Sequence, residues 1–537
     1  MAKAAHGTDA GTEVTRLEQP IILIRGFGGL GVEDEKRIAY QGFNDGTVYP
    51  HKMGENYIYE GLILRFLKSR WTYHDATNVV GYYGEPIKLK PGDIPNELKG
   101  LDPGYFSGDK IIIDPAMAVQ LLANKDRLLK SLWVFRYYDL NDRAFAGYGK
   151  ALVRLIDFIR DLVAIKTGGE KPKVNIIAHS MGGLIVREAV QSTFPARKRD
   201  AAAYINKIVT LGTPHQGISF QVLRNWVAVD AAEELEKFNH DEQEKTSNKT
   251  GFLNFGKHFP TERLLTVVGT NYRTYGPVVA SWLNRIFSVG EEFGPNYNRS
   301  DGLVKQTYAQ IPDAPRTFVH KCHGGPDSLV TSREAFEVAT RFLFGNIKLN
   351  LNLASAKVTR GHDLIGKSEF FFGVSIKPRG VDFDLFHQSA EAENCYGPFR
   401  TDDLTDANLS FGWAGKDRLI WEGWLDTTRR TPGTDKKAGT GEDIVMRLDI
   451  YVGERDRFGL GFSDNLVFRK QYYVRALFDD LDNLKLQRLE LHADEEFREG
   501  ATGKEMKKVQ NGWEFGVSGT GFEATMRLSF AVVPEKG

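Results

Sequence analysis

The sequence is poor in cysteine, has no excess of either charge, and lacks long apolar runs. Cys322 and Cys395 are the 2 cysteines in 537 residues, which excludes a disulfide framework. Lys and Arg number 70, as do Asp and Glu, and this balance argues against nucleic acid as the main partner. No apolar run reaches the length of a membrane span, so we expect no transmembrane segment.

The N-terminal residues are small and polar and include no hydrophobic segment. They do not resemble a signal peptide, so we expect a cytoplasmic protein or one exported by a route without a cleavable signal. We expect residues 1–18 to form a flexible tail. A chain of this length is too long for one core, which predicts two domains or a large domain plus a module.

The hydrophobic pattern changes near Gly345. Before it, apolar strands alternate with helical patterns, which predicts an α/β domain over residues 19–345 with a mainly parallel sheet and helices on both faces. The expected strands are 20–27, 132–138, 174–178, 205–211, 264–268 and 317–319. Thr331 and Glu334 form a capping-box pattern that predicts a last helix through Phe344.

After Gly345 apolar residues alternate with polar ones at a period of two. The clearest cases are residues 347–353, 444–452 and 524–532. Such alternation is typical of strands with one buried face, and the turns between them contain Gly, Asp and Pro. We expect an antiparallel β-sandwich over residues 346–537, with the boundary at 345/346.

A serine lies at a sharp strand-to-helix turn in the segment Val174 to Gly183. Ala178 and Gly182 supply the small residues that such a turn requires on either side of Ser180. We therefore expect Ser180 to be a catalytic nucleophile, although an idle serine at a small-residue turn fits the same pattern. His179 is interpreted as a packing or turn residue, because a neighbour at such a turn points away from the serine.

Two backbone amides are the candidates for an oxyanion hole. Met181 begins the helix after the serine, where free N–H groups face any developing negative charge. The glycine-rich stretch after the first buried strand, Arg25 to Leu30, places a second donor near the serine. Phe27 N–H and Met181 N–H form the expected pair, although an ordinary glycine-rich turn is the alternative for this stretch taken alone.

A serine at such a turn needs an acid after a late strand and a base after the last strand. Asp301 lies in a polar turn, Ser300 to Val304, that suits a fixed carboxylate. His320 and His323 both follow the last expected strand. We favour His323 as the base, because His320 is expected to continue the strand whereas His323 opens a loop rich in glycine.

These segments together resemble the lipase branch of the α/β-hydrolases, including bacterial lipases and the inositol-deacylase-like domains. The resemblance rests on Ala178 to Gly183, Thr210 to Gly217 and Ser300 to Val304, and the C-terminal region lies outside it. It implies the α/β-hydrolase fold and a catalytic triad of Ser180, Asp301 and His323. The sequence departs from the family at Arg25, which stands where a histidine is usual.

Two segments exceed what a minimal lipase needs. Residues 31–125 form a long insertion with many aromatic residues and a candidate amphipathic helix, Glu55 to Lys68. The resemblance implies a lid over residues 215–260, where Phe220 to Phe238 has helical spacing. A permanently packed surface helix fits that spacing equally well.

We expect a serine carboxylester hydrolase, lipase- or esterase-like, that degrades lipid esters through an acyl-enzyme on Ser180. A phospholipase, including one that acts as a toxin on another cell's membrane, is the first alternative. A non-catalytic hydrolase-fold protein that binds lipid or a partner is the second. We expect no cofactor and no metal. Asp327 and the acidic loop Asp479 to Asn483 could bind calcium, but this is the weaker interpretation, and a solvated turn is favoured for the loop. The expected partners are an ester substrate and a lipid surface.

Overall fold

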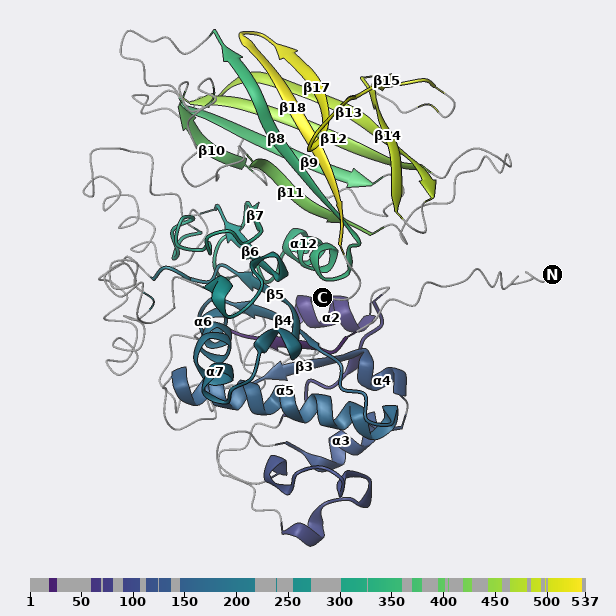
Figure 1. Ribbon diagram of the computed structural model, residues 1–537. Coiled ribbons are helices and arrows are strands. Elements are labelled where there is room, and N and C mark those ends of the chain that lie inside the picture. Colours follow the sequence, from purple (N-terminus) through teal and green to yellow (C-terminus); the bar gives the residue numbers. More distant parts are fainter. Residues whose placement is uncertain are drawn as a thin grey trace, which may run out of the picture.

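A computed structural model gives the fold (Figure 1). It describes residues 19–26, 59–68, 71–80, 90–106, 113–123, 125–136, 145–217, 238, 255–271, 301–325, 327–359, 369–378, 395–400, 404, 419–426, 443–455, 464–480, 484–493, 498 and 501–533. The expected tail 1–18, Phe27, most of the expected lid and the loop at 481–483 lie outside the described residues. Among the helices that are described, none is long and apolar enough to cross a membrane.

The first part of the chain forms a 7-stranded sheet in the order β2-β3-β1-β4-β5-β6-β7. All neighbouring strands in it are parallel. The strands are β1 (Ile21–Ile24), β2 (His74–Asp75), β3 (Ser131–Phe135), β4 (Val174–His179), β5 (Ile205–Leu211), β6 (Leu264–Gly269) and β7 (Arg316–Val319). Together with the helices that cover it, this sheet confirms the predicted α/β-hydrolase fold.

Helices cover both faces of the sheet, as the alternating side chains of β1 show. Ile22 and Ile24 belong to the buried cluster that contains α5 (Phe145–Thr167) and α6 (Met181–Glu188). Ile21 and Leu23 belong to a second cluster, with α2 (Glu60–Lys68) and α12 (Arg333–Phe344). A strand buried on both faces must be apolar throughout, and all four β1 residues are.

The smaller elements complete this part of the chain. They are α3 (Pro115–Leu121), α4 (Lys125–Leu129), α7 (Phe194–Ala196), the π-helical turn η6 (Ala189–Thr193), and the 3-10 turns η3 (Pro91–Asp93), η4 (Asn96–Leu98), η5 (Pro103–Phe106), η7 (Ala201–Ala203), η8 (Phe255–Lys257) and η9 (Thr261–Arg263). The predicted capping box of α12 is wrong by one residue. Ser332 is the N-cap, and its hydroxyl accepts the Ala335 N–H at 3.0 Å.

After α12 the chain forms two antiparallel sheets, in the orders β10-β9-β12-β13-β14-β15 and β11-β8-β18-β17-β16. Their strands are β8 (Ile347–Val358), β9 (Glu369–Pro378), β10 (Cys395–Arg400), β11 (Leu419–Leu425), β12 (Asp443–Arg455), β13 (Asp464–Asp480), β14 (Lys485–His492), β15 (Lys504–Glu505), β16 (Lys507–Val509), β17 (Gly512–Gly519) and β18 (Phe522–Val532). Apolar side chains of both sheets form one buried cluster, which confirms a β-rich second part.

The two parts of the chain meet at β11, β7 and α12 (Figure 1). The Phe342 and Trp424 rings contact edge to face, with centroids 4.8 Å apart. Val304 and Phe318 belong to the same buried cluster as the β-rich part. The boundary at 345/346 lies between the end of α12 and the start of β8, and we retain it as a proposal.

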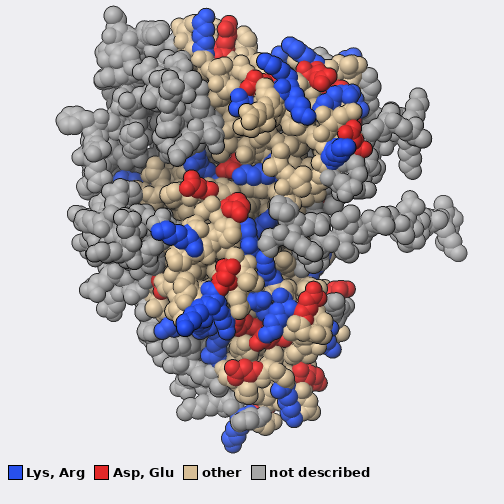
Figure 2. All heavy atoms as spheres, in the orientation of Figure 1, with Lys and Arg blue, Asp and Glu red and all other residues tan. Residues whose placement is uncertain are grey.

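The described surface carries charges of both signs. Lys and Arg side chains are interspersed with Asp and Glu over the described part of the face seen in Figure 2. This mixture accords with the equal numbers of the two charge types in the sequence.

Candidate active site

The serine lies at a strained turn between β4 and α6. Ser180 has φ 52° and ψ −127°, a region that a residue with a side chain rarely occupies. Its N–H donates to the Leu211 carbonyl at 2.9 Å, which ties the turn to β5. The turn therefore raises Ser180 above the C-terminal ends of the strands and starts the helix at Met181.

Close backbone approach explains the small residues around this turn. A Cβ on Gly182 would lie 2.5 Å from the Arg25 carbonyl oxygen, which is closer than any real side chain permits. A Cβ on Gly26 would lie 2.7 Å from the Ser180 Cβ. The end of β1 and the start of α6 therefore pack against each other without room for a methyl group.

Ser180, His323 and Asp301 form a continuous hydrogen-bonded chain. His323 Nε2 lies 2.8 Å from Ser180 Oγ, and His323 Nδ1 lies 2.8 Å from Asp301 Oδ2. Because a carboxylate only accepts, Nδ1 carries the proton and Nε2 is left to accept from the serine hydroxyl. The structure thus brings together the three residues that the sequence singled out as nucleophile, acid and base.

A tight turn fixes the carboxylate of Asp301. Asp301 Oδ1 accepts the N–H groups of Leu303 at 3.1 Å and Val304 at 2.8 Å. The main-chain N–H of His323 donates to the Asp301 carbonyl at 2.7 Å. The turn that begins at Asp301 (the acid turn) and the loop after β7 that contains His323 (the base loop) are therefore joined by backbone as well as by side chain. Asp301 is 1% exposed.

The two candidate histidines have different surroundings. β7 ends at Val319, so the expectation that His320 continues the strand is wrong by one residue. The His320 ring instead lies 3.1 Å from the hydroxyl of Thr270, measured from Nδ1. His323 is the histidine whose ring reaches Ser180.

His179 is buried beside Ser180, His323 and Asp301, and its ring hydrogen-bonds to other groups. Its ring atoms bond to the Tyr59 hydroxyl and to the His323 carbonyl. Burial lowers the pKa of His179 well below its usual value, and the nearby His323 lowers it further. The sequence pattern does not single out Tyr59 among the many aromatic residues of the insertion.

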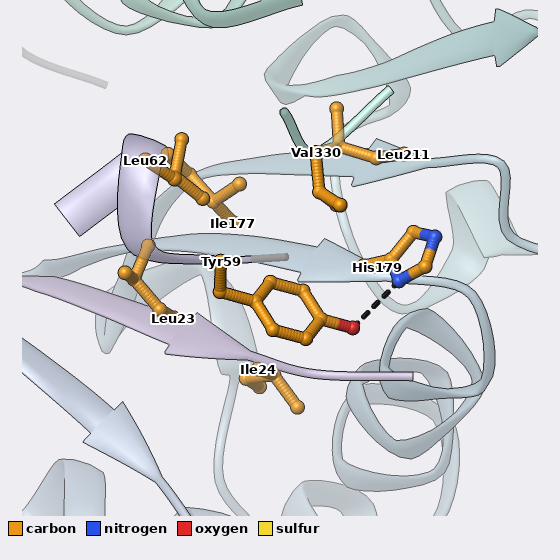
Figure 3. A pocket seen from close by; sticks show the side chains of 8 residues that line it. All are labelled: Leu23, Ile24, Tyr59, Leu62, Ile177, His179, Leu211 and Val330. Carbon is orange, nitrogen blue, oxygen red and sulfur yellow. Dashed lines mark hydrogen bonds between the residues drawn. The ribbon is translucent and has the colours of Figure 1, made fainter. Parts of the chain in front are cut away.

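Figure 3 shows the residues that line a small recess at this pair, with the Tyr59 hydroxyl directed at the His179 ring. The recess is too tight to admit a water molecule. Its lining is otherwise aliphatic, namely Leu23, Ile24, Leu62, Ile177, Leu211 and Val330. The hydrogen bonds of Tyr59 and His179 are therefore made in a dry, apolar setting, where they are stronger than in water.

The structure describes one of the two expected oxyanion donors. Met181 is the first residue of α6, where backbone N–H groups have no partner within the helix. The other expected donor, Phe27, lies outside the described residues. The N–H of the preceding residue, Gly26, donates to the Tyr59 hydroxyl at 2.8 Å and points there rather than toward the serine.

The described residues contain no group of three or more His, Cys, Asp or Glu side chains arranged to hold a metal ion. Asp327, the residue considered for calcium, instead pairs with Lys321 at 2.7 Å. The side chain of Asp479 is near Lys485, at 3.8 Å.

Comparisons with known proteins give one family match. The model of the PGAP1-like alpha/beta domain matches residues 116–270, and the resemblance predicted from the sequence therefore holds for that segment. No curated protein matches the sequence.

Several solved structures have similar chains, and three of them illustrate the range. The Bacillus licheniformis lipase BlEst2 is 15% identical, with a TM-score of 0.31, over 62% of this chain and 96% of its own. Phospholipase PlaB from Legionella pneumophila, in complex with thio-NAD, is 11% identical, with a TM-score of 0.31, over 91% of this chain and 100% of its own. The metagenomic carboxyl esterase MGS0156 is 15% identical, with a TM-score of 0.27, over 41% of this chain and 68% of its own.

Proposed function

We propose that this chain is a serine carboxylester hydrolase that cleaves lipid esters through an acyl-enzyme on Ser180. The observation that carries the proposal is the hydrogen-bonded series from Ser180 through His323 to Asp301, with both distances at 2.8 Å. A nucleophile, a base and an orienting acid within hydrogen-bond reach are what acyl transfer requires.

The reaction would proceed in two stages. Ser180 Oγ attacks the ester carbonyl carbon while His323 Nε2 takes the hydroxyl proton, and the resulting imidazolium then protonates the departing alcohol. Water attacks the acyl-enzyme in the second stage, again with His323 as base, and releases the acid and the free serine. Asp301 keeps the Nδ1 proton in place and stabilises the positive charge on the ring.

The negative charge of each tetrahedral intermediate needs donors on the opposite side from His323. We assign this role to the N–H groups of Met181 and Phe27. The N-terminal end of α6 adds a favourable dipole at the same place.

The experiment that tests the proposal is labelling of the full chain by a fluorophosphonate probe. The wild type and the exposed control Ser518→Ala should be labelled, and Ser180→Ala should not. Absence of labelling in the folded wild type would favour the non-catalytic binding protein.

A panel of short-, medium- and long-chain esters, together with phospholipid vesicles, identifies the substrate class. Preference for long acyl chains presented as an emulsion supports the lipase. Release of fatty acid from the vesicles, with little turnover of neutral esters, would show that the enzyme is a phospholipase rather than a lipase. Turnover of short soluble esters alone would limit the proposal to an esterase.

A further inference from the structure

Tyr59 and His179 connect four segments of the chain at the active site. The Gly26 N–H donates to the Tyr59 hydroxyl at 2.8 Å. That hydroxyl lies 2.7 Å from His179 Nδ1, and His179 Nε2 lies 2.9 Å from the His323 carbonyl oxygen. The series therefore runs from the end of β1, through the start of α2 and the end of β4, to the loop that contains His323. Figure 3 shows its central bond, between Tyr59 and His179.

The chemistry of these groups fixes every proton in the series. A carbonyl oxygen only accepts, so His179 Nε2 carries a proton and donates it to His323. Burial lowers the pKa of His179, so its ring is neutral and Nδ1 accepts. The Tyr59 O–H must then donate to Nδ1, which leaves the phenol oxygen to accept the Gly26 N–H. Within this series every hydrogen bond is therefore donated in the same direction, from Gly26 toward His323.

We propose that Tyr59 and His179 are positioning residues that hold the base loop and the oxyanion loop in register with Ser180. This proposal rests on the proposed hydrolase function. The main chain of His323 is held at both ends of the residue, since its N–H donates to Asp301 and its carbonyl accepts from His179. Gly26 immediately precedes the expected oxyanion donor Phe27, so the Tyr59 hydroxyl anchors that loop at its first residue.

The helix that directly follows Tyr59, α2, is itself tied to the segment that follows His323. Arg65 of α2 donates to the carbonyl of Thr331 at 3.0 Å and to that of Ser332 at 3.3 Å. These residues follow the base loop and lead into α12. The insertion therefore contacts the site at two places, through Tyr59 just before α2 and through Arg65 within it.

The neutral state of His179 also matters for catalysis. Its ring centroid lies 4.9 Å from that of His323, which must become positively charged in each transition state. A second positive ring at that distance would oppose this step. By donating to Nδ1, the Tyr59 hydroxyl occupies the site where His179 would take up a proton.

Hydrogen exchange on the full chain tests the network without reference to activity. Tyr59→Phe keeps the ring and removes the hydroxyl, so deuterium uptake should rise in peptides that contain Gly26 and in those that contain His323. Tyr105→Phe is the matched control, because it removes another hydroxyl with a hydrogen bond, at 2.7 Å to Asp161. It should leave both peptides unchanged. Unaltered uptake at both places in Tyr59→Phe would overturn the proposal.

Kinetics on a soluble p-nitrophenyl ester test the positioning role. Tyr59→Phe should lower kcat about tenfold with little change in KM, and fluorophosphonate labelling should slow by the same factor. His179→Gln, which keeps a donor near the His323 carbonyl, should retain more activity than His179→Leu. Equal kcat in Tyr59→Phe and wild type contradicts the proposal, as does equal activity in the two His179 variants. A wild type that neither hydrolyses nor labels overturns the hydrolase function, while the exchange result still decides the network.

Discussion

Glu422 of β11 accepts a hydrogen bond at 2.8 Å from the main-chain N–H of Arg316, the first residue of β7. The other carboxylate oxygen lies 2.9 Å from Lys348 Nζ, and Glu422 is 4% exposed. β7 is the strand that leads to His323. A buried carboxylate of the β-rich part is thus bonded to the strand that precedes the proposed catalytic base.

Replacing Glu422 by Leu should destabilise the protein, because a buried amide and an ammonium group lose their acceptor. We expect a loss of about 1–3 kcal/mol in the free energy of unfolding, measured by urea denaturation. Glu514→Gln is the control, since Glu514 and its partner Arg527 are 18% and 36% exposed and a pair that is open to solvent contributes less than a buried one. Equal effects of the two substitutions would show that the contact at Arg316 is unimportant.

A chain that ends at Gly345 tests the proposed domain boundary. We expect it to fold and to react with a fluorophosphonate, because the triad lies entirely before that residue. It should be less soluble, since Phe342 and Phe318 lose the surface that buries them. Labelling should also slow, because Val304 of the acid turn belongs to the cluster that is removed. Failure to fold would show that the two parts share one core.

The two histidines after β7 should differ sharply in their importance. His323→Ala removes the group that lies 2.8 Å from the Ser180 hydroxyl, and kcat should fall by several orders of magnitude. His320→Ala removes a contact to Thr270 and should retain most of the rate. Ester hydrolysis by the two purified variants checks this, and an inactive His320→Ala with an active His323→Ala would require a different base.

Asp301→Asn should be nearly inactive although it is folded. The asparagine side chain can donate an N–H group to His323 Nδ1, so that Nδ1 becomes an acceptor. The ring proton then lies on Nε2, which can no longer accept the serine hydroxyl proton. We expect kcat to fall by about 10⁴. Asp327→Asn, which breaks a pair with Lys321 near the same loop, should keep its activity. Circular dichroism spectra that match the wild type are needed for both variants.

Stability should fall in mild acid because of two buried histidines. Burial lowers the pKa of His179 and His215 in the folded state well below 6.5. The unfolded chain then binds more protons as the pH falls below about 6.5, so the stability that is fully present above this pH is progressively lost. Each histidine contributes a slope of up to about 1.4 kcal/mol per pH unit. As the pH is lowered, the urea midpoint of His179→Gln should decrease less steeply than that of the wild type. Equal slopes in the two proteins would show that His179 is not buried as a neutral ring.

Local patterns in the sequence predict the parallel sheet and the position of the serine. Both follow from short-range rules, namely apolar runs for strands and small residues at a strand-to-helix turn. The helix cap was misplaced because Thr331 and Ser332 are both capping residues, and the pattern does not choose between neighbours. Local pattern favours His323 over His320, and the His323 ring is the one that lies 2.8 Å from the Ser180 hydroxyl, although β7 ends at Val319, before His320.

Tyr59 could not be predicted in the same way. It lies 120 residues from His179 in the sequence, and its role depends on how α2 packs over the ends of β1 and β4. An aromatic residue beside an amphipathic helix is ordinarily part of a core, and its ring is indeed buried. The positioning role of Tyr59 depends on the hydrogen bonds of its hydroxyl group in the apolar recess, and the hydrophobic periodicity of the sequence carries no information about them.

The separation of the triad along the chain has a consequence for folding and synthesis. Ser180 and His323 are 143 residues apart, and the strands between them pair in parallel. Such long-range contacts form late, and a nascent chain exposes the serine well before its base has been made. Under the proposed function, Ser180 would therefore stay an ordinary alcohol until β7 joins the sheet, and the first appearance of fluorophosphonate reactivity would mark the end of sheet assembly.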